Sequence, residues 1–214
     1  MRKIISRLII MVILAAVIFL GYYSYKGYEM YQNTINDKSL SVRVEEFRSK
    51  DDYVKLDQIS KIYQELVIES EDKRFYHHGP IDYIGLTRAT VTNLITMSFK
   101  EGGSTITQQL AKNLCLTFEK SLDRKIAEVI IAYQLEKDYS KDEILEMYLN
   151  ITYLGEGNYG IKAASNYYYQ VEPSEITKKQ AEVLVKTLKS PSTYNPSKIS
   201  NSIILTLMFI LNDF

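Results

Sequence analysis

The sequence of 214 residues predicts a mainly α-helical domain behind one apolar N-terminal helix. Three observations lead to this prediction. The run from Leu8 to Tyr23 carries no charge, apolar side chains recur at helical spacing between residues 54 and 196, and several hydroxyl residues are followed three positions later by Glu or Gln. The last two patterns are typical of amphipathic helices and of their capped starts. We therefore expect an all-α domain with few strands.

The uncharged N-terminal run approaches the length of a membrane anchor. Extended by Ile4 and Ile5, it comes close to the roughly 20 apolar residues that cross a bilayer. A cleaved signal peptide has a similar apolar run but ends at small residues. Here the run ends in Tyr22 and Tyr23, and tyrosine is typical of the membrane interface. We therefore favour an uncleaved transmembrane anchor at residues 7–25 over a signal peptide.

Basic residues set the predicted orientation of this anchor. Arg2, Lys3 and Arg7 precede the apolar core of the run, whereas Lys26 alone follows it closely. Because positive residues stay on the cytoplasmic side, we expect residues 1–6 in the cytoplasm. The domain then lies outside the plasma membrane, and the protein is single-pass.

Composition excludes several classes of function. The 26 basic residues balance 26 acidic ones, but four bases precede Glu29, the first acid, so the rest of the chain is net acidic. An acidic body excludes wholesale electrostatic binding to nucleic acid. Cys115 has no partner for an internal disulfide. Together with His77 and His78 it cannot supply a multi-ligand zinc site.

The segment after the anchor and the first part of the domain differ in pattern. Residues 26–53 are polar and contain SVRVEEF, a β-like alternation, so we expect a stalk or a short strand there. The predicted domain, residues 54–196, opens with apolar residues at helical spacing over 59–67. Asp82 predicts the start of a second helix, which runs toward Met97.

Capping patterns predict the remaining helices. Glycines at 102–103 and 155–160 predict loops or close approaches of the backbone. The predicted helices run from Thr105 to about Leu114, from Leu122 to Glu136 with Ile126, Val129, Ile130 and Tyr133 on its apolar face, from Lys141 to Asn150 behind Ser140 and Glu143, and from Thr177 and Gln180 to a stop at Pro191.

Two short motifs match known signatures but lack the context that these require. The G-x-G-x-x-G of residues 155–160 follows a predicted helix, whereas the dinucleotide fingerprint follows a strand. The S-x-x-K of residues 70–73 lacks the S-D-N and K-T-G elements of penicillin-binding acylases. We therefore reject nucleotide binding and acyl-enzyme chemistry for these segments.

Three other segments concentrate residues that carry chemistry. The first holds Glu71 and Asp72 beside aromatic residues, where a carboxylate can act as a proton acceptor or donor. The second places two glycines before a helix start over 102–113, which exposes backbone N–H groups to an anion. The third, residues 124–128, combines two bases and an acid, and Lys120 and Arg88 extend the basic set.

Each segment alone has an ordinary structural interpretation. The acidic pair can lie at a surface or cap a helix, the second segment can be a plain capped amphipathic helix, and Arg124 with Glu128 can form an i,i+4 surface ion pair. Taken together, the three segments describe a site with two carboxylates for a sugar reaction and several cations for a phosphate-bearing ligand.

In order and spacing these segments resemble the peptidoglycan glycosyltransferases of family 51, which have a lysozyme-like fold. Members are either monofunctional or form the N-terminal domains of bifunctional penicillin-binding proteins. The matching motifs are E-D-x-x-F-x-x-H at 71–78, G-G-S-T-I-T-Q-Q-x-x-K-N at 102–113, R-K-x-x-E at 124–128, K-x-E-I-L-E-x-Y-L-N at 141–150, Y-L-G-x-G-x-Y-G-I-x-A-A at 153–164 and S-P-x-x-Y-N-P at 190–196.

The resemblance implies a reaction on lipid II, a disaccharide-peptide carried on undecaprenyl pyrophosphate. The 4-hydroxyl of the acceptor sugar attacks C1 of the growing chain, and the pyrophosphate leaves with inversion. Glu71 is the implied general base, and Glu128 is a second essential carboxylate on the donor side. The implied binding residues are Lys112, Lys120, Arg124 and Lys125 for pyrophosphate with help from Arg88, and Ser104, Gln108 and Gln109 for sugar or phosphate.

The resemblance also implies partners and cofactors. They are lipid II, the nascent glycan strand, membrane lipid and other cell-wall synthesis proteins, with no nucleic acid and no covalent cofactor; a divalent cation, Mg or Mn, is compatible with the reaction. In the family, the segment that here holds Ile95, Met97 and Phe99 dips into lipid, although plain core packing would explain the same residues.

The chain departs from the family pattern in three places. Gly79 precedes Pro80 where the family has His-x-Gly, and Gln170 replaces a family glycine. We expect both loop changes to be tolerated. The tail 197–214 is apolar where the family has a polar helix, and it can pack on the domain, lie at the membrane or be an artefactual end. Two other functions remain open, namely a lysozyme-like glycan hydrolase or lytic transglycosylase and a non-catalytic scaffold.

Overall fold

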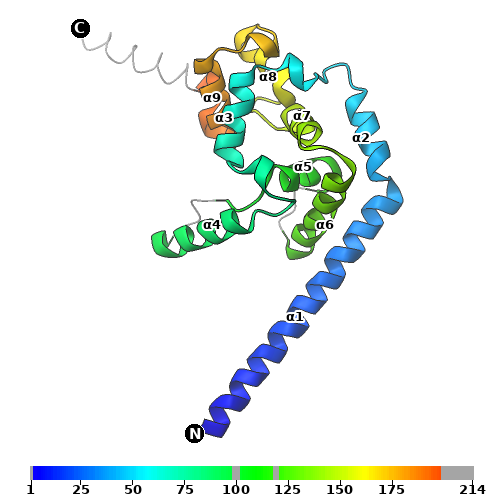
Figure 1. Cartoon of the computed structure of the whole chain (residues 1–214), viewed down its shortest axis with the longest axis vertical. Helices are drawn as coiled ribbons and strands as arrows, with labels where there is room; N and C mark the ends of the chain where they lie inside the picture. The colour runs from blue at the N-terminus through cyan, green and yellow to red at the C-terminus, as the bar shows by residue number, and fades with distance from the viewer. Residues whose placement is uncertain (1, 98–101, 118–120, 199–214) are drawn as a thin grey trace, which may run out of the picture.

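The computed structural model describes residues 2–97, 102–117 and 121–198. The prediction of a mainly α-helical chain is confirmed, and the described residues contain no β-strand beyond one isolated bridge between Tyr153 and Tyr159. The helices are α1 Arg2–Asp37, α2 Leu40–Arg48, α3 Lys61–Glu71, α4 Tyr83–Thr96, α5 Ile106–Cys115, α6 Leu122–Asp138, α7 Lys141–Ile151, α8 Gly160–Tyr169, α9 Lys178–Lys189 and α10 Pro191–Tyr194, with short 3₁₀ turns at Leu56–Gln58, Phe75–His77 and Pro173–Glu175 (Figure 1).

Helix α1 runs from the N-terminus to the domain as one continuous element (Figure 1). Among the described residues, the segment Ile4–Asp37 is long and apolar enough to cross a membrane. Its C-terminal part packs along α6, and Tyr31 donates a hydrogen bond to Gln134 there. At Gly27 an added Cβ would lie 2.5 Å from Ile126 Cβ, so the two helices approach as closely as a residue without a side chain allows.

The expected stalk or strand after the anchor is wrong. Residues 40–48 form helix α2, which Ser39 caps by accepting from Val42 N–H. Leu40, Val44 and Phe47 are buried in the main core, so the folded unit begins before residue 54. These residues follow i, i+4, i+7 spacing, and the burial of that face outweighs the alternation of valines that favoured a strand.

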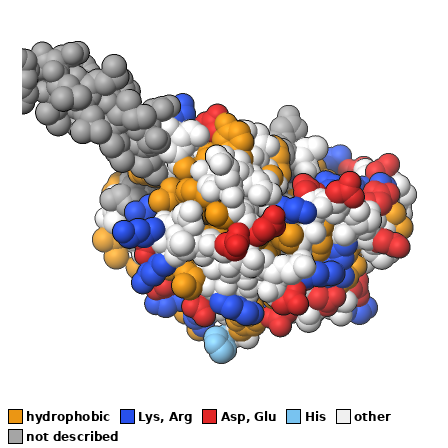
Figure 2. Space-filling model, turned by 90° about the horizontal axis from the view of Figure 1, so that it is seen from above, with side chains coloured by type: hydrophobic (Ala, Val, Ile, Leu, Met, Phe, Trp, Pro, Cys, Tyr) orange, Lys and Arg blue, Asp and Glu red, His pale blue; other side chains and the backbone are white. Residues whose placement is uncertain are grey.

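The predicted helix starts are confirmed. Thr105 with Gln108, Ser140 with Glu143, and Thr177 with Gln180 each form a reciprocal capping box, and Asp82 caps α4 by accepting from Gly85 N–H at 2.8 Å. These caps satisfy N–H groups that have no partner within their own helix. Helices α3, α5, α7 and α9 then enclose a common core. Acidic and basic side chains are interspersed over the face seen in Figure 2.

Helix α6 forms as expected, but the predicted apolar face is wrong. Its fully buried side chains include Ala127, Ile131 and Leu135, whereas Tyr133 is exposed. Ile126 lies instead against Gly27 of α1. Because α6 lies between the core and α1, both of its faces carry apolar residues, and the sequence alone did not indicate which face is central.

The departures from the family pattern at Gly79 and Gln170 differ in backbone geometry. Gly79 has no positive φ and open space around it. Gln170, the C-cap of α8, has φ of 56° and lies in the left-handed region that favours glycine.

We expect Gln170→Gly to stabilise the fold. Removing the left-handed penalty of a side chain outweighs the added entropy of the unfolded chain by about 0.5–1 kcal/mol. Thermal unfolding followed by circular dichroism measures this effect. Gln170→Ala is the control, because it keeps the penalty and should leave the midpoint unchanged. Equal midpoints for the glycine and alanine variants would contradict the prediction.

Candidate functional site

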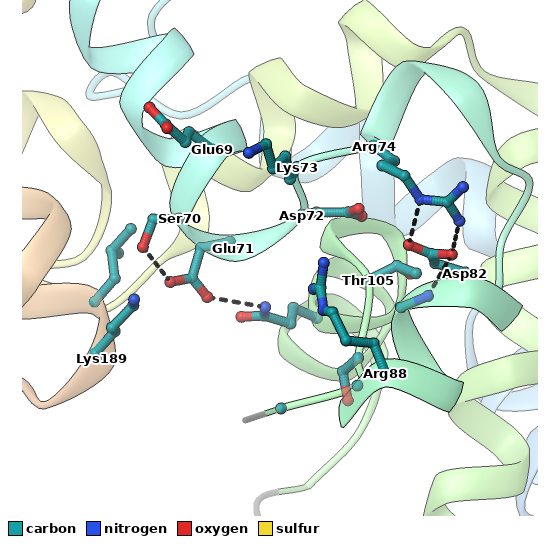
Figure 3. A pocket seen from close by; sticks show the side chains of 16 residues that line it. Glu69, Ser70, Glu71, Asp72, Lys73, Arg74, Asp82, Arg88, Thr105 and Lys189 are labelled. Atoms are coloured by element: carbon teal, nitrogen blue, oxygen red, sulfur yellow. Dashed lines mark hydrogen bonds and ion pairs between the residues drawn. The ribbon is translucent and has the colours of Figure 1, made fainter. Parts of the chain in front are cut away.

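A cleft of about 540 Å³ opens where the end of α3, the start of α4, the loop before α5 and the end of α9 meet (Figure 3). It brings together four of the predicted residues, Glu71, Arg88, Ser104 and Gln109. The complete lining is Glu69, Ser70, Glu71, Asp72, Lys73, Arg74, Asp82, Gly85, Arg88, Gly102, Gly103, Ser104, Thr105, Gln109, Leu188 and Lys189.

The Glu71 carboxylate is the last side chain of α3 and is half-buried. Gln109 Nε2 donates to its Oε2 at 3.2 Å, and Ser70 Oγ lies 3.4 Å from its Oε1. In Figure 3 the Glu71 carboxylate lies beside Ser70 and faces the cleft. A carboxylate that is held by neutral donors and open to a cleft can accept a proton from a bound hydroxyl.

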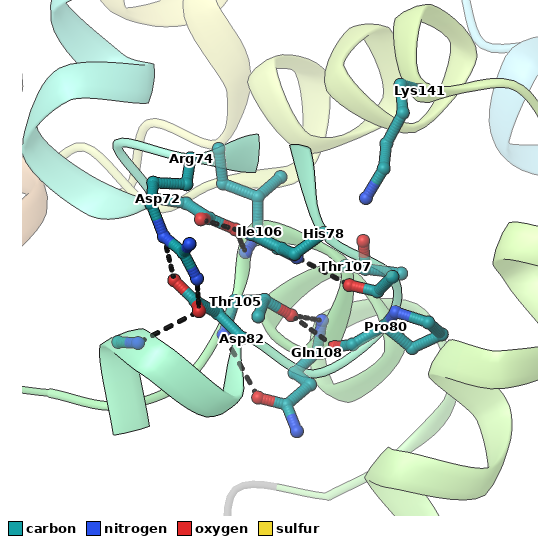
Figure 4. Close-up of polar contacts among 12 residues, drawn as sticks. Asp72, Arg74, His78, Pro80, Asp82, Thr105, Ile106, Thr107, Gln108 and Lys141 are labelled. Carbon is teal, nitrogen blue, oxygen red and sulfur yellow. Dashed lines mark hydrogen bonds and ion pairs between the residues drawn. The ribbon is translucent and has the colours of Figure 1, made fainter. Parts of the chain in front are cut away.

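Asp72 connects the first two motifs beneath the cleft (Figure 4). Its side chain is 3% exposed; Oδ2 accepts from Ile106 N–H at 3.0 Å, and Oδ1 lies 2.6 Å from His78 Nε2. The carboxylate thus caps the first turn of α5 from another segment, where the helix dipole favours a negative charge. This contact fixes the end of α3, and therefore Glu71, against α5.

Asp72, His78 and Asp82 place ligand atoms within 4.8 Å of one another, which is the spacing of a metal site. Arg74, however, forms an ion pair with Asp82 (Figure 4). Burial opposes the charged form of Asp82, but Arg74 and Gly85 N–H outweigh it and lower the pKa of this carboxyl. The Arg74 guanidinium already neutralises Asp82, and Asp72 already accepts a hydrogen bond from the first turn of α5. These residues therefore do not fit a divalent cation.

A second cluster lies on α5 and α6 behind Ser104. Glu128 is buried and forms ion pairs with Lys125 and, at 3.8 Å, with Arg124. Lys125 Nζ also donates to Ser104 Oγ at 2.8 Å, so Ser104 connects this cluster to the cleft. Burial, followed by the charges of Arg124 and Lys125, lowers the pKa of Lys112, although Glu128 opposes this shift. Lysine and arginine side chains held close together in this way can bind a phosphate group.

The lowered pKa of Lys112 predicts an effect on stability. Below the lowered pKa, Lys112 is charged in both the folded and the unfolded protein, and burial makes this charge unfavourable in the folded protein. This cost to stability shrinks as the pH rises above the lowered pKa, and it is gone above the ordinary pKa of 10.5. At pH 7 we therefore expect Lys112→Met to raise the unfolding midpoint while activity falls. Thermal unfolding measures the shift, with Lys137→Met on the exposed side of α6 as the control. A lower midpoint for Lys112→Met would contradict this account.

Two predicted binding residues are described neither in the cleft lining nor among the charged residues around Glu128. Lys120 lies outside the described residues. The carbonyl oxygen of Gln108 accepts from Thr105 N–H at 3.0 Å within the capping box, and the side chain is buried. The structure thus gives Gln108 a role in capping α5, and its contact with substrate stays a prediction.

Lys189 and Lys73 line the cleft and were not predicted. Lys189 ends α9 and directly precedes the closing S-P-x-x-Y-N-P motif, so this position was the available sequence clue. Tyr148 was also missed. It lies within the fourth motif on α7 and donates a hydrogen bond to Gln109 Oε1 at 3.1 Å.

Helix α4 carries exposed apolar side chains beside the cleft. Ile95 and Met97 are 77% and 90% exposed, so core packing does not explain these two residues, and Phe99 lies outside the described residues. In Figure 1, α4 lies at the edge of the domain that faces the N-terminal end of α1.

Comparison with known proteins connects this geometry to a family. The Transglycosylase family model matches residues 37–212. Penicillin-binding protein 1F of Bacillus subtilis (strain 168) is 51% identical over 143 residues, covering 67% of this chain and 20% of that protein. Penicillin-binding protein 1A/1B of the same organism is 44% identical over 169 residues, covering 78% and 18%. Penicillin-binding protein 1A of Neisseria flavescens is 40% identical over 162 residues, covering 76% and 20%.

The chain thus spans about a fifth of the length of these relatives. Together with the apolar helix α1, the relatives indicate that the protein is anchored in a membrane.

Proposed function

Because the chain belongs to the transglycosylase family, the peptidoglycan glycosyltransferases of family 51, we propose that it polymerises lipid II into β-1,4 glycan strands during cell-wall synthesis. The observation that carries this proposal is that one cleft joins the Glu71 carboxylate to the cation cluster of α5 and α6 through Ser104. In the proposed reaction, the carboxylate serves the sugar hydroxyl, and the cations serve the pyrophosphate leaving group.

The proposed step is a single inverting displacement. Glu71 accepts the proton of the acceptor 4-hydroxyl while the oxygen of that hydroxyl forms a bond to C1 of the donor sugar. The bond from C1 to the pyrophosphate oxygen breaks, and its electron pair leaves with undecaprenyl pyrophosphate. Lys112, Arg124 and Lys125 stabilise the charge on that group, with Arg88 on the cleft side. Pyrophosphate is a good leaving group, so these cations suffice without a general acid.

In the proposed orientation, α1 spans the plasma membrane with its basic N-terminus in the cytoplasm. The domain then faces the outer leaflet, where lipid II is presented. Exposed apolar side chains at the C-terminal end of α4, Ile95 and the C-cap residue Met97, contact lipid. This arrangement brings the mouth of the cleft to the depth of the substrate headgroup.

Glycan formation from labelled lipid II by the detergent-solubilised full chain tests the proposal. We expect polymer bands on a gel, and digestion by a muramidase should remove them. Reactions with added Mg²⁺ or Mn²⁺ and with a chelator measure the need for a divalent cation. Fragments released from purified peptidoglycan without any polymer from lipid II would instead identify a hydrolase. Folded protein that does neither would favour a scaffold.

A further inference from the structure

Two hydrogen bonds in series connect the buried core to the Glu71 carboxylate. Tyr148 on α7 is 1% exposed, and its hydroxyl donates to Gln109 Oε1 at 3.1 Å. Gln109 on α5 is half-buried, and its Nε2 donates to Glu71 Oε2 at 3.2 Å. Three helices thus contribute one residue each to a chain that ends at the cleft.

The direction of donation in these two hydrogen bonds is fixed at the buried end of the series, by Tyr148. A glutamine side chain can present either its NH₂ group or its carbonyl oxygen, and a charged carboxylate can only accept. For the NH₂ group of Gln109 to face Glu71, its oxygen must face Tyr148, and the tyrosine must donate. Burial, followed by the nearby charge of Glu71, raises the pKa of Tyr148 well above its ordinary value. The hydroxyl therefore keeps its proton.

We propose that Tyr148 is a positioning residue for the reaction proposed above, and that its hydroxyl orients the Gln109 amide so that the Glu71 carboxylate stays charged and aimed into the cleft. The inference rests on that proposed function. Without the hydroxyl, the amide is free to turn its oxygen toward Glu71. A carbonyl oxygen beside the carboxylate favours the protonated form, which cannot accept a proton from the acceptor sugar.

Other groups near Glu71 stay in place when this hydroxyl is removed. Tyr63 on α3 is fully buried, and burial and the charge of Glu71 raise its pKa. Arg88 of α4, Lys189 of α9, and Glu69, Asp72 and Lys73 around the end of α3 line the same cleft, and Lys112 lies one turn beyond Gln109 on α5. Their charges are common to both proteins, so a changed pH profile reports the orientation of the amide.

The test is the pH dependence of lipid II polymerisation by full-length Tyr148→Phe. We expect kcat about tenfold lower near pH 6.5 with KM within about twofold of the unaltered protein. The deficit should shrink to about twofold near pH 9, because high pH restores the charged carboxylate whichever way the amide points. A loss of packing alone would lower the rate by the same factor at every pH.

Tyr168→Phe is the matched control. The hydroxyl of the half-buried Tyr168 donates to Leu154 O at 2.9 Å, outside the cleft. The variant therefore loses one hydrogen bond and leaves the series from Tyr148 to Glu71 unchanged. Unchanged kcat and pH profile in Tyr148→Phe, or a deficit independent of pH, would overturn the inference while the unaltered protein still polymerises. Failure of the unaltered protein to polymerise would instead overturn the proposed function. Thermal unfolding of both variants separates loss of fold from loss of positioning.

Discussion

Glu71→Gln should lower kcat for glycan polymerisation by about 10²–10⁴-fold, the usual contribution of a general base. Gln is nearly isosteric with Glu, and its side-chain oxygen can still accept from Gln109 Nε2, so the cleft should keep its shape. The substitution removes only the capacity to take a proton from the acceptor hydroxyl. We therefore expect KM for lipid II to change by less than about threefold, since binding is separate from proton transfer.

Rates with labelled lipid II across a range of pH measure this effect. Glu69→Gln is the matched control, because Glu69 lines the same cleft two residues earlier, is exposed and loses the same charge. An equal fall in both variants would mean that the cleft needs negative charge and not a base at Glu71. Full activity in Glu71→Gln would exclude Glu71 as the base and would direct attention to Glu128.

Local patterns predicted the helix starts well because a cap is a contact between residues three positions apart. Thr105 with Gln108 and Ser140 with Glu143 illustrate this, since each pair forms within its own turn. Where packing against a second element decides the secondary structure of a segment, the local pattern predicted the wrong structure. Helix α2 was expected as a strand or stalk because the alternation of its valines gave no indication of the core against which Leu40 and Phe47 pack.

The same limit applies to the site. The motifs identified Glu71 and Glu128 because the family resemblance placed them, and the structure brings Glu71 to the cleft and pairs Glu128 with cations. Lys189 and Tyr148 reach Glu71's surroundings from α9 and α7, which are distant in sequence. Lys189 directly precedes the last motif and Tyr148 lies within the fourth, but the residues around them do not indicate that either one lies near Glu71.

Glu128→Gln should reduce both stability and activity because it removes a buried negative charge that lies among three neighbouring cations, Lys112, Arg124 and Lys125. Breaking a buried ion pair costs about 3–5 kcal/mol, and less where a partner is partly in water. Lys125 is 41% exposed and Arg124 is 13% exposed. We therefore expect a loss of about 2–3 kcal/mol, which lowers the unfolding midpoint by roughly 5–10 °C in a domain of this size.

The cause of this loss can be separated from ordinary damage to the fold. If Lys112, Arg124 and Lys125 repel one another once Glu128 is neutral, a bound anion should relieve them. Inorganic pyrophosphate should then raise the unfolding midpoint of Glu128→Gln by more than that of the unaltered protein. Polymerisation should still fall by about 10²-fold or more, because a cluster without its carboxylate no longer holds the cations in place for the leaving group.

Glu136→Gln supplies the comparison on the same helix. Glu136 forms an ion pair with Lys141 at 2.6 Å and accepts from Thr107 at 2.7 Å, so it loses a similar set of contacts outside the cation cluster. We expect a comparable fall in its midpoint, no special response to pyrophosphate and near-normal polymerisation. If pyrophosphate stabilises both variants equally, the repulsion account is wrong. If Glu128→Gln keeps its activity, the buried carboxylate supports the fold and not the reaction.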